Sequence, residues 1–208
     1  GLVPKRASEG QRINGVMKGE SAEVLQEGFL PYEALPKLLD PSHGYLFNTN
    51  NTPFNSAHED DNLEENDFAD FKIGFKESEN NRSTRFMQLI DSKESLSMED
   101  FFSIKYDIKY PDSLWTPSGA NIVFKTAPDS YANYDKYEQV FDLIQGWDKR
   151  ADTTSIGAAQ WAIYYNYFLG IGGKQLLPEE RMDRALKATD KHLMKYFGRY
   201  DIQLRDYQ

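Results

Sequence analysis

Three asparagines lie close together in the sequence Asn-Thr-Asn-Asn-Thr-Pro at residues 48–53, which we call the asparagine run. A carboxamide has N–H donors at one end and a carbonyl acceptor at the other, so a rigidly held asparagine can stabilise a negatively charged oxygen in a reaction. The same residue types are typical of an ordinary turn, because asparagine tolerates unusual backbone angles and bonds to its own backbone. The run by itself leaves both interpretations open.

A second candidate is the acidic stretch at residues 58–70. Clustered carboxylates suit a hard cation such as calcium, but the spacing and glycine of an EF-hand loop are absent. The sequence favours a solvated acidic loop, the usual role of such charge runs. The seven acids are Glu59, Asp60, Asp61, Glu64, Glu65, Asp67 and Asp70.

The asparagine run follows an apolar segment and precedes a proline. Tyr45, Leu46 and Phe47 suit a buried strand, whereas Pro53 lacks the N–H group that a central strand needs. We therefore predict a strand that ends at the asparagines and holds their amides in place.

The rest of the chain is predicted to be mainly helical. Apolar residues recur at spacings of three and four, which is typical of amphipathic helices. Residues 111–128 contain several proline and glycine residues and are predicted to be a connection. The 155–169 helix is apolar on most faces, so we expect it to be buried. Helices are predicted at residues 79–92, 97–105, 134–147, 155–169 and 178–197.

The predicted fold class is α+β and predominantly helical, with a few short strands. We expect a strand-rich segment at residues 1–58 that carries Asn50, an acidic loop at 59–78 and a helical region at 79–208. His192 lies on the last long helix and is expected to be a packed or exposed helix residue, since no second histidine stands four residues away.

Composition narrows the classes of partner. The 208 residues include 33 acidic and 24 basic side chains, giving a net charge of −9, which argues against nucleic acid and anionic membranes. No apolar run is long enough to span a bilayer, and the absence of cysteine excludes disulfides. The mean hydropathy of −0.69 is low for a free-standing enzyme, so part of the surface is expected to contact other segments.

Several segments resemble the β subunit of penicillin-acylase-type N-terminal nucleophile (Ntn) hydrolases. The first are Gly-Phe-Leu-Pro-Tyr-Glu-Ala-Leu-Pro at residues 28–36 and the asparagine run. Arg82 and Arg85 are similar to paired arginines that open a helix in that family. Residues 147–148 and 155–159 are similar to its Trp-Asp-Gly and Ser-x-Gly-Ala signatures. The segment at 196–202 looks closer to the acyl-homoserine-lactone, cephalosporin and aculeacin acylases.

The resemblance implies hydrolysis of linear amides by an N-terminal serine whose own amine acts as the base. It further implies that the short strands belong to an Ntn αββα core. In that family an asparagine at the position of Asn50 donates to the oxyanion, and an arginine at the position of Arg82 orients the site. Phe47 and Phe54 are then expected to line an acyl pocket. No cofactor is required, although a structural calcium is possible, with Asp60 or Asp61 matching one acidic ligand.

The chain also departs from the family pattern, because it begins with Gly1 and has no Ser-Asn start. We therefore expect an internal piece of a β subunit that is inactive alone. Its expected partners are the α subunit, the rest of the β subunit and a small N-acyl amide, in a periplasmic or secreted acylase connected with antibiotics or quorum quenching. The alternative is a non-catalytic helical binding or scaffolding domain.

Overall fold

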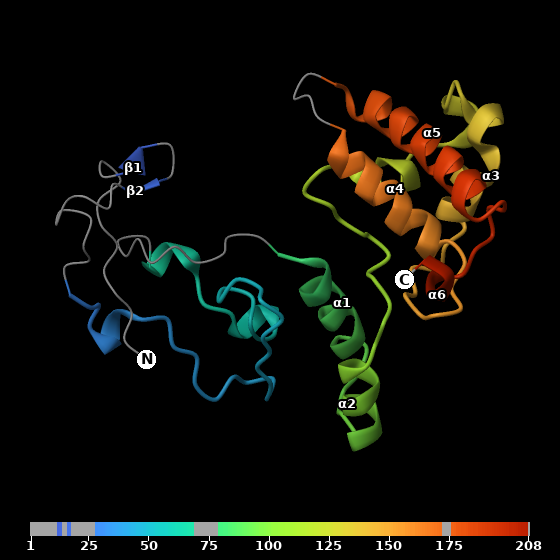
Figure 1. The fold of residues 1–208 in the computed structure, drawn as a ribbon. Helices are drawn as coiled ribbons and strands as arrows, with labels where there is room; N and C mark the ends of the chain where they lie inside the picture. The colour runs from blue at the N-terminus through green and yellow to red at the C-terminus, as the bar shows by residue number, and fades with distance from the viewer. Residues whose placement is uncertain (1–11, 14–15, 18–27, 69–78, 172–175, 208) are drawn as a thin grey trace. The chain divides into compact units, whose positions relative to one another are not determined.

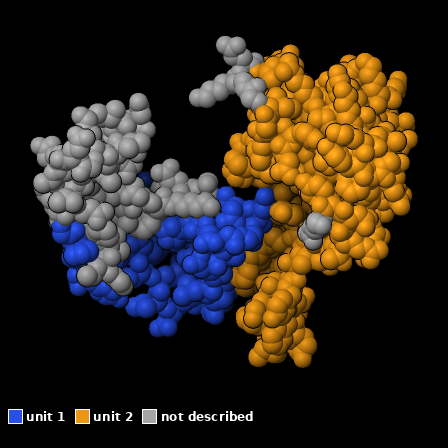
Figure 2. Space-filling model, in the orientation of Figure 1, with its two compact units in different colours: residues 1–83 blue, residues 84–208 orange. Residues whose placement is uncertain are grey.

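The computed structural model describes residues 12–13, 16–17, 28–68, 79–171 and 176–207. They belong to two compact units, one within residues 1–83 and the other within residues 84–208, which have different colours in Figure 2. The described chain is predominantly helical, as the sequence predicts (Figure 1). The predicted three-part division at residues 58 and 78 stays a prediction.

The described residues of the first unit consist mostly of turns and short 3-10 helices. Its two strands, β1 (Arg12–Ile13) and β2 (Val16–Met17), form a small antiparallel pair in which Ile13 lies opposite Val16. The 3-10 helices are η3 (Tyr32–Ala34), η4 (Glu59–Asp61) and η5 (Glu65–Phe68).

The prediction of a strand before the asparagine run is wrong, because the backbone at residues 45–51 is irregular. The N–H group of Phe47 donates to the carbonyl of Ser56 at 2.9 Å, and a turn that includes the hydrogen bond from Asn55 N–H to Thr52 C=O connects these segments. Leu46 is 55% exposed, so the apolar segment does not have the buried setting expected of a core strand. The strands of an Ntn core are not seen in the described part of the chain.

Each predicted helix is present, and the 155–169 helix begins three residues later than predicted, at Ala158. None of the described helices is long and apolar enough to cross a membrane. The helices are α1 (Asn81–Ile90), α2 (Met98–Lys105), α3 (Tyr134–Gln145), α4 (Ala158–Gly170), α5 (Pro178–Tyr196) and α6 (Leu204–Tyr207).

Helix α2 has a strong N-terminal cap and an exposed apolar face. The Ser97 hydroxyl accepts from the Asp100 N–H at 3.0 Å, and the Asp100 carboxylate accepts from the Ser97 N–H at 3.0 Å, which is a capping box. Lys93 donates to the same carboxylate, and these donors lower the pKa of Asp100 to about 2. The side chains of Phe101 and Phe102 are 53% and 48% exposed.

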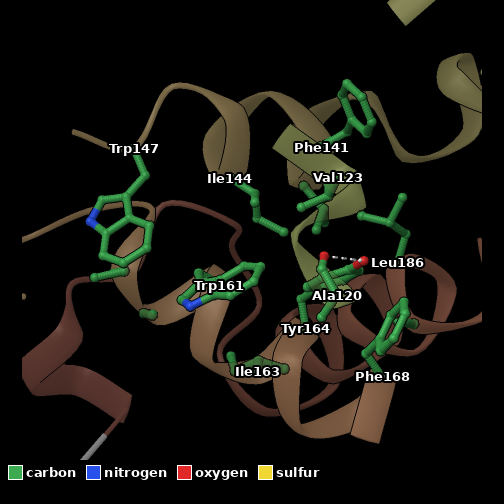
Figure 3. Close-up of a cluster of buried hydrophobic side chains, with 14 of the residues drawn as sticks. Ala120, Val123, Phe141, Ile144, Trp147, Trp161, Ile163, Tyr164, Phe168 and Leu186 are labelled. Atoms are coloured by element: carbon green, nitrogen blue, oxygen red, sulfur yellow. Dashed lines mark hydrogen bonds between the residues drawn. The ribbon is translucent and has the colours of Figure 1, made fainter. Parts of the chain in front are cut away.

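The core of the second unit lies where α3, α4 and α5 pack around a buried 3-10 helix, η6 (Ala120–Phe124) (Figure 3). The prediction that residues 111–128 are only a connection is therefore wrong, since Ala120 and Val123 are fully buried. The Tyr164 hydroxyl, from buried helix α4, donates to the Ala120 carbonyl at 3.1 Å. This bond gives the buried phenol a partner and ties η6 to α4.

Candidate functional site

The asparagine run forms a tight loop whose shape is set by its own side chains. Asn51 Oδ1 accepts from the Thr49 N–H at 2.8 Å, and the Asn51 NH₂ donates to the carbonyls of Thr52 and Asn55. Asn50 has a left-handed backbone with φ of 62°, which asparagine adopts more readily than most residues. Its N–H donates to Asn48 Oδ1 at 2.9 Å. The side chain of Asn50 is exposed.

Asn80 connects this loop to the start of α1. Its Oδ1 accepts from the backbone N–H groups of Arg82 and Ser83 at 2.9 and 3.1 Å, so it caps the helix. Its NH₂ donates to the Thr49 carbonyl at 3.1 Å. One side chain therefore positions both the asparagine run and the first turn of the helix.

Arg82 and Asn50 are hydrogen-bonded to each other. Arg82 Nη2 donates to Asn50 Oδ1 at 2.7 Å, a short distance for a charge-assisted bond between two exposed side chains. A guanidinium has only donors, so the end of the amide that faces it must be the oxygen. The bond therefore sets the orientation of the Asn50 amide, with its NH₂ group as the other end.

An amide oriented in this way can act as a fixed hydrogen-bond donor. Its backbone is held by Asn48, its neighbour Thr49 is tied to Asn80, and its oxygen is held by Arg82. Donors that are already oriented before the reaction stabilise developing negative charge without a reorganisation cost. The bond from Arg82 to Asn50 Oδ1 agrees with the orientation suggested from the sequence, although a loop and not a strand end carries Asn50, and the catalytic role of Asn50 is a proposal.

The two aromatic residues predicted to line an acyl pocket flank the asparagine run. Phe47 is half-buried. Phe54 is also half-buried, and its ring lies 5.9 Å from that of Phe68 between ring centres. Their predicted contact with an acyl chain stays a prediction.

Asp60 and Asp61 lie on η4 but have different surroundings. Asp61 accepts from the Ser42 hydroxyl at 2.7 Å, the Ser42 N–H at 2.9 Å and the His43 N–H at 3.0 Å. The bonds from Ser42 and His43 hold the pKa of Asp61 well below its usual range. Asp60 Oδ2 instead lies 3.4 Å from Nδ1 of His58 and 3.9 Å from Nε2 of His43.

These surroundings do not match a calcium donor set. Calcium takes about six to eight oxygen ligands, whereas two imidazole rings stand beside Asp60. Three of the hydrogen bonds to Asp61 come from backbone and hydroxyl donors, which a cation would displace or compete with. Calcium at Asp60 and Asp61 stays a prediction, and we derive no step through it.

Sequence reasoning missed the role of Asn80 and the pairing of His43 with His58. Asparagine directly before an amphipathic helix is a signal for a cap, so the cap was detectable from the sequence. The bond from Asn80 to Thr49 spans 31 residues and has no local signal. His192 packs as expected, since its ring contacts the Tyr167 hydroxyl at 2.9 Å and burial lowers its pKa.

A shallow cavity of about 560 Å³ lies in the second unit. None of the predicted site residues contributes to it, so it does not support an acyl pocket near Asn50. Its walls are formed by Gln139, Asp142, Leu143, Arg199, Tyr200 and Asp201.

Comparison with known proteins gives one family. The sequence profile of the penicillin amidase family matches residues 1–199, nearly the whole chain. The chain therefore belongs to the penicillin amidase family, which agrees with the hydrolase and acylase character suggested by its motifs. No curated protein matches the chain.

Proposed function

We propose that this chain is part of an N-acyl amide hydrolase in which Asn50 donates to the oxyanion and Arg82 fixes the orientation of Asn50. The observation that carries the proposal is the 2.7 Å hydrogen bond from Arg82 Nη2 to Asn50 Oδ1 in a member of the penicillin amidase family. This bond supports a donor role because it holds the amide oxygen at Arg82, which leaves the NH₂ donors at the opposite end of the amide.

The proposed reaction uses a nucleophile from another segment of the same acylase. A serine hydroxyl attacks the amide carbonyl carbon and its proton passes to the α-amine of that serine. The negative charge then builds on the former carbonyl oxygen, where the Asn50 NH₂ donates. Collapse of this intermediate releases the amine, which takes the proton, and water hydrolyses the acyl-enzyme.

The proposed partners are the α subunit and the remaining segments of the β subunit, which would also supply the strands of the Ntn core. The exposed aromatic side chains on α2 support such a contact, because clustered exposed apolar residues often mark interfaces. They are Phe101 and Phe102, with Tyr106 beside them at the C-cap of the helix. A periplasmic or secreted location and a specificity like that of the homoserine-lactone, cephalosporin and aculeacin acylases belong to the same proposal.

The function is tested by amine release from N-acyl amides. We expect the complete natural polypeptide that contains this chain to hydrolyse at least one substrate from a panel of N-acyl homoserine lactones, phenylacetyl amides and long-chain acyl amides. The 208-residue chain alone should hydrolyse none. If the complete polypeptide is inactive on the whole panel, the alternative of a non-catalytic helical binding or scaffolding domain is favoured.

Replacing Arg82 by alanine should lower kcat roughly 10- to 100-fold, because a hydrogen bond to a charged group contributes about 1.5–3 kcal/mol. Without the guanidinium the Asn50 amide loses the hydrogen bond that directs its oxygen to Arg82. Arg184→Ala is the matched control, since Arg184 is an exposed arginine on α5. Steady-state kinetics of the complete enzyme measure both, and equal kcat values for the two variants would remove Arg82 from the mechanism.

A further inference from the structure

Two histidines and an aspartate from separate segments meet in the first unit. His43 lies in the turn after Pro41, His58 is the N-cap of η4, and Asp60 lies within η4. Their potential ligand atoms all lie within 4.8 Å of one another. The proposed hydrolysis does not use this group of side chains, and the family resemblance implies only Asp60 or Asp61, as a calcium ligand.

The positions of these side chains are set by hydrogen bonds that surround them. Asp61 Oδ2 lies 2.8 Å from His43 Nδ1, and the Asp61 carboxylate also accepts from the His43 N–H at 3.0 Å. A carboxylate on one ring nitrogen of a histidine favours a proton there and leaves the lone pair on the other nitrogen. His43 Nε2 is therefore the expected ligand atom, and it faces Asp60 Oδ2 at 3.9 Å.

Two of the three ligand-to-ligand distances are close to those of a tetrahedral metal site, and the third, between the ligand atoms of the two histidines, is within 4.8 Å. Donors that each lie about 2.0–2.1 Å from one zinc ion are separated from each other by about 3.3–3.5 Å. Asp60 Oδ2 is 3.4 Å from His58 Nδ1 and 3.9 Å from His43 Nε2. Movements of a few tenths of an ångström would bring the aspartate to this spacing from both imidazoles, and a metal at His58 Nδ1 would replace the hydrogen bond that this nitrogen accepts from the Asp60 N–H at 3.3 Å.

The two rings must also turn for both to bind one ion. They are stacked with centres 3.5 Å apart and planes 13° from parallel, whereas the lone pair of an imidazole nitrogen lies in the plane of its ring. The side chains of His43 and His58 are 38% and 28% exposed, so solvent adjoins both rings and they have room to tilt.

We propose that His43, His58 and Asp60 bind a divalent transition-metal ion of the zinc class, with Asp61 as the carboxylate that positions His43. Imidazole nitrogen with one carboxylate suits zinc and similar ions, whereas calcium selects oxygen ligands. Three protein ligands leave one coordination position for water.

The test is calorimetric titration of Zn²⁺ into the complete 208-residue chain without an affinity tag. We expect one zinc ion to bind per chain, with affinity unchanged by a large excess of Ca²⁺. His43→Ala and His58→Ala should each weaken binding at least about tenfold, and Asp61→Asn about 10- to 100-fold because it acts on the orientation of His43. The circular dichroism of each variant, compared with the parent, checks that it is folded.

The chain has three histidines, so His192→Ala is the matched control and should keep full zinc affinity. The visible absorption of Co²⁺ as a zinc substitute should show tetrahedral coordination and disappear in folded His58→Gln. Absence of zinc binding, zinc binding that survives both histidine substitutions, or displacement of zinc by Ca²⁺ would each overturn the proposal. The measurement is independent of hydrolysis, so its failure leaves the role of Asn50 untouched.

Discussion

Replacing Asn50 by alanine should lower kcat for an N-acyl amide about 10²- to 10³-fold in the complete enzyme, because the oxyanion loses a donor that is oriented before the reaction begins. KM should change little, since the charge on the oxygen develops only after the substrate has bound. The hydrogen bond from Arg82 to Asn50 Oδ1 at 2.7 Å is the structural basis of this expectation.

Two further substitutions distinguish the effect of losing the Asn50 amide from the effect of backbone strain at this position. Asn50 has φ of 62°, so alanine there adds backbone strain, whereas glycine removes the amide without that strain. Asn50→Gly should therefore show the same loss of kcat as Asn50→Ala. Asn50→Asp should be at least as impaired, because it puts negative charge where the oxyanion forms.

Asn166 provides the matched control for these variants. It is an exposed asparagine on α4 whose NH₂ donates to the Tyr207 hydroxyl at 3.0 Å. Asn166→Ala should leave kcat unchanged. A kcat for Asn50→Gly equal to that of Asn166→Ala would show that the Asn50 amide takes no part in catalysis.

Replacing Gly157 by alanine should destabilise the second unit by roughly 2–5 kcal/mol, from left-handed backbone strain and overpacking together. Gly157 has φ of 91°, and a Cβ there would lie 2.6 Å from the Cβ of Trp147 and 2.7 Å from the carbonyl oxygen of Leu143. Neither neighbour is the end of a flexible side chain, so the backbone itself must move. Urea unfolding followed by tryptophan fluorescence measures the loss.

Gly170→Ala is the control for this substitution. Gly170 is the last residue of α4, and a Cβ there would meet nothing within 4 Å. The free energy of unfolding of Gly170→Ala should stay within about 1 kcal/mol of that of the parent protein. If Gly157→Ala unfolds at the same urea concentration as Gly170→Ala, the close packing at the start of α4 does not limit stability.

The helices were predictable because their signal is local. In α5 the buried residues Met182, Leu186, Thr189 and Leu193 recur at spacings of three and four, and Pro178 opens the helix. The close contact of Gly157 with Trp147 also gives a physical reason for the glycine of the Ser-x-Gly-Ala motif. That contact could not be read from the spacing of the two residues.

The absence of the predicted strand and the presence of the buried 3-10 helix could not be predicted, because neither has a local signal in the sequence. An apolar segment such as residues 45–47 becomes a strand only where another strand supplies its hydrogen bonds, and its own composition does not contain that information. In η6 the apolar residues Ala120 and Val123 stand in a segment that is too short for a periodic pattern and lies between prolines.

Some candidate site residues could likewise be identified from the sequence, and others could not. Family motifs drew attention to Asn50 and Arg82, and the chemistry of an amide suggested how an arginine would orient it. The pairing of His43 with His58 could not be predicted, because the two residues are separated by fifteen positions in the sequence. The Pro41 turn and bonds to Asp61 place His43, whereas His58 contacts Asp60.

A double-mutant cycle on kcat tests most directly whether Arg82 acts through Asn50. The four proteins are the parent enzyme, Arg82→Ala, Asn50→Gly and the double variant, each assayed as the complete enzyme on the same N-acyl amide. We predict that Arg82→Ala lowers kcat roughly 10- to 100-fold in the parent but less than about twofold when residue 50 is glycine. The reason is that the effects of substitutions at two interacting residues do not add. The same loss of kcat in both backgrounds would contradict the account.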